Sequence, residues 1–117
     1  MPQATDQERQ ARLEKMQQGL KTAVKIPLAT MRLGDGAWNA MCDIARYGNP
    51  ASRSDIEVGA RSLETGIWGA YRNVVINLAD IQDEPYRQET LAAARQLVDR
   101  AARKCAEVLA ILEQGQP

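Results

Sequence analysis

Two asparagines one helical turn apart are the residues of this chain best placed to do chemistry, because the sequence has no histidine. Asn73 and Asn77 are separated by an i,i+4 step, so on a helix both amides project from the same face. The neighbouring side chains are apolar, and an amide without a partner costs free energy there. Two interpretations stay open: the amides bridge neighbouring helices, or they line a groove that orients a polar heterocycle. The first interpretation also has three glycines packing against a second helix: Gly59, Gly66 and Gly69.

The segment from Asn49 to Asp55 is the second candidate for chemistry. Ser52 and Ser54 each precede an acidic residue by three positions, which is the spacing of a capping box at a helix start. A turn and a helix cap therefore explain the segment. The alternative is that the helix N-terminus binds an anionic or polar ligand group, with Arg53 available to a carboxylate.

Composition excludes several classes of function. Without histidine the chain can form neither a Ser-His-Asp triad nor a His-ligated zinc site, and no metal site or redox-cofactor motif is expected. Fifteen basic and fifteen acidic residues balance, which argues against nucleic acid or an anionic membrane as a partner. No secretory signal or membrane-spanning run is visible, and Cys42 and Cys105 are expected to be reduced thiols. A cytoplasmic protein is expected.

Apolar periodicity predicts three long helical stretches within one domain, residues 1–117. The first covers residues 7–47 and contains Pro27, which removes a backbone donor, so a bend or break is expected near that residue. Whether the stretch forms one bent helix or two stays open. Gly48, Asn49 and Pro50 end it.

The second stretch runs to Leu78, and the third begins at Asp83 as a capping residue and ends at residues 115–117. The joints between stretches are short, and short joints make consecutive helices antiparallel neighbours. The expected fold is an all-α, antiparallel, up-and-down bundle of three long helices.

Three motifs together resemble the carboxy-terminal half of the cyclodeaminase/cyclohydrolase family. They are the turn N-x-x-x-R-S-D at residues 49–55, the helix G-x-x-G-A-Y-x-N-V-x-I-N-L at 66–78, and I-x-D-E at 81–84. The Ala23–Leu28 segment is similar to the family's proline-bent helix, so the resemblance covers residues 8–113. Members include formiminotetrahydrofolate cyclodeaminase domains and methenyltetrahydrofolate cyclohydrolases.

The resemblance implies an all-helical, dimer-forming domain that acts on a one-carbon tetrahydrofolate without a prosthetic group. It implies either closure of 5-formiminotetrahydrofolate to 5,10-methenyltetrahydrofolate with release of ammonia, or hydrolysis of the methenyl form. Carried over to this chain, Asp55 is the candidate for proton transfer, and Asn73 and Asn77 are candidates to orient the pterin. The remaining residues carried over as substrate-binding are Asn49, Ser54, Arg53 and Arg72, the two arginines as candidates to meet the glutamate tail.

The family's first half, with its glycine-rich segment, has no counterpart in this sequence, and Gly34-Asp35-Gly36 is no substitute. Three amphipathic helices without the missing ones should leave an apolar face exposed. We therefore expect a homo-oligomer or a separate amino-terminal half as partner. The alternative to an enzyme is a non-catalytic helical assembly module, or half of a split enzyme that needs a partner chain.

Overall fold

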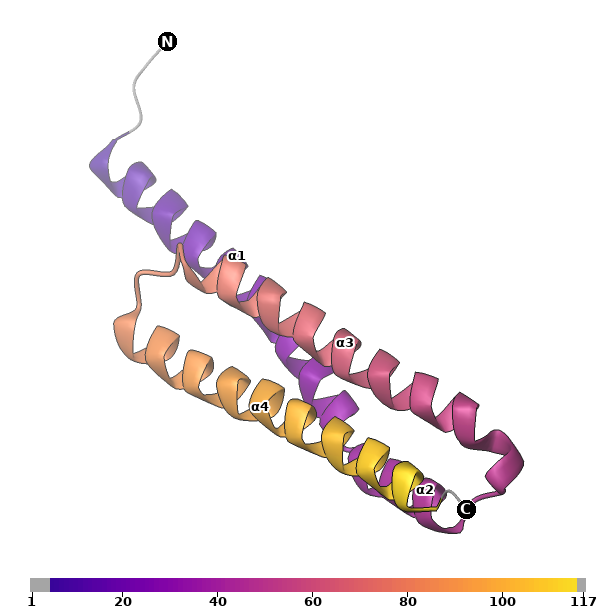
Figure 1. Ribbon diagram of the computed structural model, residues 1–117. Coiled ribbons are helices and arrows are strands. Elements are labelled where there is room, and N and C mark those ends of the chain that lie inside the picture. The colour runs from indigo at the N-terminus through magenta and orange to yellow at the C-terminus, as the bar shows by residue number, and fades with distance from the viewer. Residues whose placement is uncertain (1–4, 116–117) are drawn as a thin grey trace.

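A computed structural model describes residues 5–115, and within that range it contains helices and no strands. The helices are α1 (Asp6–Asp35), α2 (Trp38–Tyr47), the short 3-10 helix η1 (Pro50–Ser52), α3 (Arg53–Leu78) and α4 (Glu84–Gln114). The chain runs along α1 and α2, returns along α3 and reverses again along α4 (Figure 1). The predicted all-α, antiparallel bundle of three long helical stretches is confirmed. The end of the third stretch is confirmed at Gly115, and residues 116–117 lie outside the described range.

The first stretch is bent, and its interruption lies at Gly36 and Ala37, where α1 ends and α2 is about to begin. Of the predicted bend or break near Pro27, the break does not occur, because the α-helix is continuous through that residue. Val24 and Met31, about one turn to either side of Pro27, are completely buried. Packing of these residues against the other helices outweighs the one backbone hydrogen bond that proline removes.

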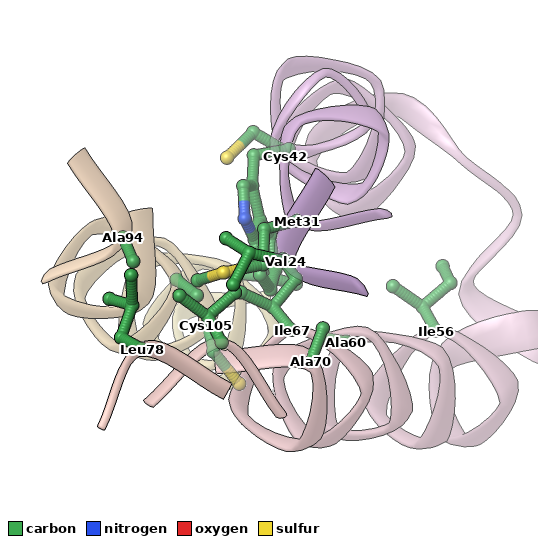
Figure 2. Packing of buried hydrophobic residues seen from close by; sticks show 14 of the residues in the cluster. Val24, Met31, Cys42, Ile56, Ala60, Ile67, Ala70, Leu78, Ala94 and Cys105 are labelled. Carbon is green, nitrogen blue, oxygen red and sulfur yellow. The ribbon is translucent and has the colours of Figure 1, made fainter. Parts of the chain in front are cut away.

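The core is a line of buried side chains between α1, α3 and α4. Val24 and Met31 of α1 meet Ile67 of α3 and Cys105 of α4 in the middle of the bundle (Figure 2). Trp38 of α2 is also completely buried. Cys42 and Cys105 are free, as predicted, and burial together with a hydrogen bond to Glu64 raises the pKa of the Cys105 thiol to about 11. Between residues 5 and 115, no helix combines the length and apolar character that crossing a membrane requires.

Of the two glycines of α1, Gly34 is the one that packs closely against α3. A Cβ atom at this position would lie 2.8 Å from Cγ1 of Ile67 and 3.4 Å from Cδ1 of Leu63. The absence of a side chain at Gly34 therefore allows close contact between the two helices. The Arg100 guanidinium of α4 then fixes the end of α1, because its Nε donates to Asp35 Oδ1 at 2.8 Å.

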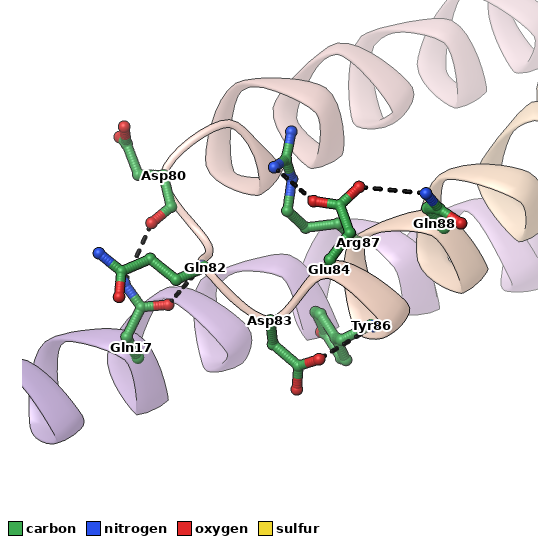
Figure 3. Close-up of polar contacts among 8 residues, drawn as sticks. All are labelled: Gln17, Asp80, Gln82, Asp83, Glu84, Tyr86, Arg87 and Gln88. Atoms are coloured by element: carbon green, nitrogen blue, oxygen red, sulfur yellow. Dashed lines mark hydrogen bonds and ion pairs between the residues drawn. The ribbon is translucent and has the colours of Figure 1, made fainter.

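The α3–α4 turn is tied to α1 by side chains of that helix (Figure 3). Gln17 donates from Nε2 to the Asp80 carbonyl at 3.1 Å and accepts from the Gln82 N–H at 2.8 Å. Asp83 caps α4 as predicted, since its side chain accepts from the Tyr86 N–H at 3.2 Å. Its other carboxyl oxygen lies 2.8 Å from Lys21 Nζ. The Lys21 bond and, second, the Tyr86 bond hold the pKa of Asp83 below its ordinary value of 3.8.

Replacing Gly34 with valine should lower the free energy of unfolding by about 2 kcal/mol, because a branched side chain overpacks the contact with Ile67. Urea unfolding measures the change. Gly19→Ala is the matched control: its Cβ meets nothing within 4 Å, so the better helix former should stabilise the protein by up to about 1 kcal/mol. Equal effects of the two substitutions would contradict the assigned contact.

Asp83→Asn should destabilise the protein at neutral pH, and the difference from the wild type should shrink as the pH falls below 3.8. A carboxyl whose pKa is lowered on folding contributes stability above its unfolded pKa and loses it as the folded form is protonated. Urea unfolding at neutral and strongly acidic pH tests this. Asp80→Asn is the control, since only the backbone carbonyl of Asp80 is bonded to α1. A difference between Asp83→Asn and wild type that does not depend on pH would refute the role of the carboxylate.

Candidate functional site

A groove of about 480 Å³ runs between α1 and α3 and contains both asparagines. None of the side chains that line it carries a charge. Its α1 wall consists of Ala23, Ile26, Pro27 and Thr30, and its α3 wall of Gly66, Gly69, Ala70, Asn73 and Asn77. The groove is therefore a mostly apolar surface with amide groups on one side, a combination that suits a flat molecule with a polar edge.

Helical geometry places the two amides in this groove. Asn73 is exposed and Asn77 is half-buried one turn later on the same side of α3. Asn77 donates from Nδ2 to the Asn73 backbone carbonyl at 3.0 Å, so its own helix holds the side chain. The Asn77 amide oxygen takes no part in that bond. Among residues 5–115, the Asn77 side chain makes no hydrogen bond to another helix, so the structure gives no bridge at this residue.

The glycines of α3 do not share one role. A Cβ atom at Gly66 or Gly69 would meet no atom within 4 Å, so these two residues do not pack against another helix of this chain, as one interpretation expected. Gly59 does face a neighbour, because its Cβ would lie 3.3 Å from the Met41 methyl group. Because Gly66 and Gly69 have no side chains, the backbone of α3 is exposed along this wall of the groove.

The turn from Asn49 to Asp55 lies at the other end of α3. Asn49 and Arg53 line a separate hollow of about 230 Å³, bounded by the end of α2 and the end of α4. Asn49 Oδ1 accepts from the Ala51 N–H at 2.9 Å and caps η1. Ser52 makes no side-chain capping bond, so the predicted capping box at this residue does not form. The buried Nη2 of Arg53 has no hydrogen-bond partner within residues 5–115.

The structure thus divides the predicted site residues between two places. Asp55 and Asn77 lie on one straight helix and are 22 positions apart, so about 33 Å separates them at 1.5 Å per residue. Ser54 and Asp55 are exposed in the first turn of α3, next to the Arg53 hollow. Arg72 is exposed on α3 and lines neither hollow. A single chain brings only Asn73 and Asn77 together in the groove.

The chemistry available in the groove is hydrogen bonding and packing rather than proton transfer. Thr30 supplies the one hydroxyl of the lining, and its Oγ1 donates to the Ile26 carbonyl at 3.0 Å. Within the described residues no three His, Cys, Asp or Glu side chains come together as metal ligands. The α1 wall of the groove was not predicted from the sequence. The pattern that could have indicated it is an uncharged stripe from Ala23 to Thr30. Lys21, Lys25 and Arg32 lie on the opposite side of the helix.

The fold is an all-helical bundle with an amide-lined groove between two of its helices, and comparison with known proteins gives its family. The family model described as formiminotransferase-cyclodeaminase matches residues 1–96. The chain therefore belongs to the formiminotransferase-cyclodeaminase family.

Individual relatives agree with this membership. The chain is 43% identical to the formimidoyltransferase-cyclodeaminase of Gallus gallus over 99% of its own length and 21% of the relative's. It is 47% identical to the protein of the same name from Dictyostelium discoideum, over 80% of this chain and 17% of that one. The methenyltetrahydrofolate cyclohydrolase of Methylorubrum extorquens is 33% identical over 86% of this chain and 49% of the relative. The chain thus spans about a fifth of the cyclodeaminases it matches and about half of the cyclohydrolase.

Proposed function

We propose that this protein acts in folate one-carbon metabolism and that the groove between α1 and α3 binds the pterin ring of a one-carbon tetrahydrofolate. The observation that carries the proposal is the pair Asn73 and Asn77 at the edge of an uncharged groove, in a chain of this family. A pterin is flat, and its edge holds several hydrogen-bond donors and acceptors. Two amides on one helix face can satisfy such an edge while the apolar wall covers the ring.

The reaction proposed is that of the cyclodeaminases or of the cyclohydrolases, since this chain has relatives with each of these names. In cyclodeamination of 5-formiminotetrahydrofolate, N10 attacks the formimino carbon and its proton passes to the imino nitrogen. A second proton, from a general acid or the solvent, lets that nitrogen leave as ammonia, and the 5,10-methenyl cation remains. In hydrolysis of the methenyl form, water attacks the same carbon and a C–N bond opens. Both reactions need a positioned acid or base at the one-carbon unit and no prosthetic group.

Asp55 is the proposed proton-transfer group, with Asn49, Arg53, Ser54 and Arg72 as further substrate-binding candidates. The distance of about 33 Å along α3 means that Asp55 of one chain cannot reach a pterin held by Asn77 of the same chain. The proposal therefore requires that a second chain, or another part of a longer protein, completes the reacting centre. A cytoplasmic location and the absence of a nucleic-acid partner remain predictions.

A non-catalytic helical assembly module is the second candidate function. The open surface at Gly66 and Gly69 favours it, because small residues on an exposed helix face allow another helix to approach closely. Ligand binding distinguishes the two proposed functions: a folate enzyme binds its substrate in the groove, whereas an assembly module binds no ligand there.

Calorimetric titration with 5-formyltetrahydrofolate, a stable analogue, tests the proposed function. We expect micromolar binding, and we expect Asn77→Ala to weaken it at least tenfold, which is about 1.4 kcal/mol. The matched control is Asn39→Ala, because Asn39 is an exposed asparagine of α2 outside the groove. Its substitution should leave the affinity unchanged. A folded protein that binds no analogue would favour the assembly module.

A further inference from the structure

Proline in the middle of a helix leaves one backbone carbonyl without its donor. In an α-helix the N–H of each residue donates to the carbonyl four positions earlier, and proline has no N–H. Helix α1 is continuous through Pro27, so the carbonyl that loses its donor is that of Ala23. Thr30 and Asn77, two polar side chains of the groove, donate to other carbonyls. The Ala23 carbonyl is therefore an acceptor that the helix itself does not use.

This free acceptor lies in the groove between α1 and α3. Ala23 and Pro27 both line the groove, and a carbonyl in a helix points along the axis toward the residue four positions later. The Ala23 carbonyl therefore lies on the side of α1 that forms the groove wall. Ala23 is half-buried and the lining beside it is uncharged. An unpaired carbonyl in such a place costs free energy unless water or a ligand donates to it.

A second acceptor lies on the α3 wall at the same level of the groove. The two helices run antiparallel, with Gly34 against Ile67 at one end and Gln17 bonded to the α3–α4 turn at the other. This register places Ala23 at the level of Asn77. Asn77 donates from Nδ2 to a carbonyl of its own helix at 3.0 Å, which leaves its Oδ1 free to accept. Each wall thus contributes one acceptor.

We propose that the Ala23 carbonyl and Asn77 Oδ1 together bind the N–H edge of the ligand, and that Pro27 is a positioning residue because it frees the carbonyl. The ligand is a flat ring with a cyclic guanidine edge, which in a pterin is the 2-amino group and the ring N–H beside it. The amino group has two protons and can donate to both walls. A ring with a carbonyl in that place would leave both acceptors unpaired, so the pair selects against it. This assignment rests on the proposed function for the identity of the ligand.

Calorimetric titration of Pro27→Ala with 5-formyltetrahydrofolate tests the role of the free carbonyl. Alanine restores the N–H that pairs with the Ala23 carbonyl, so the urea midpoint should rise while the affinity falls at least tenfold. Pro85→Ala is the matched control, because Pro85 lies in the first turn of α4, where no helical carbonyl loses a donor. Its affinity should equal that of the wild type. An equal affinity of Pro27→Ala would mean that only water occupies the carbonyl, and would overturn the proposal.

The donors of the ligand provide a second test, which separates the carbonyl from packing of the Pro27 ring. The probe is an analogue of 5-formyltetrahydrofolate in which a methyl group replaces the 2-amino group. The wild type should bind this analogue at least tenfold more weakly than the parent compound, and Pro27→Ala should discriminate between the two much less. Loss of ring packing alone would lower both affinities by the same factor. An unchanged ratio would therefore overturn the proposal.

The Ala23 carbonyl can also be observed directly in the wild-type chain. A donor that bonds to a carbonyl moves its ¹³C resonance downfield, so the Ala23 carbonyl resonance should move downfield on titration with 5-formyltetrahydrofolate. The carbonyl of Ala92, on the exposed face of α4, is the control and should not move. An Ala23 resonance that stays in place at saturation would refute this subsite alone. A folded wild type that binds no ligand would count against the proposed function, and the subsite would be refuted with it.

Discussion

The close contact of α1 with α3 at Gly34 is the constraint on which the rest of the structure depends. With no side chain at that position, Ile67 can sit against the α1 backbone, and the spacing of the two helices is set there. The groove lies further along the same helix pair, between Ala23–Thr30 and Gly66–Asn77. Its width therefore follows from the packing at Gly34, while the Gln17 and Lys21 bonds to the α3–α4 turn fix its other end.

Local signals in the sequence were enough to predict most of the fold. The apolar stripes, the stop at Gly48 and the Asp83 cap gave the three stretches, their order and their direction. Two features could not be read in this way. Continuation of the helix through Pro27 depends on burial of Val24 and Met31 against other helices, and the contact role of Gly34 depends on Ile67, 33 residues further along the chain. Long-range packing decides both, and it leaves no local pattern.

The sequence predicted the residues of the candidate site but not how far apart they lie in the folded chain. The i,i+4 spacing correctly placed Asn73 and Asn77 on one face, because helix geometry is local. The same geometry separates them from Asp55 by most of α3, so motifs that are close in sequence are far apart in one chain. The chain spans about half of the cyclohydrolase it resembles and about a fifth of the cyclodeaminases. The proposed reacting centre therefore requires that another polypeptide surface bring an acid or base to the groove.

The central claim is that the groove between α1 and α3 binds the folate. The most direct test is a titration of the ¹⁵N-labelled chain with 5-formyltetrahydrofolate, followed by two-dimensional NMR. The account predicts that the side-chain amides of Asn73 and Asn77 and the backbone amides of Gly66 and Gly69 shift most, since all four residues line the groove. Shifts confined to the hollow around Asn49 and Arg53, or no shifts at saturating ligand, would contradict it.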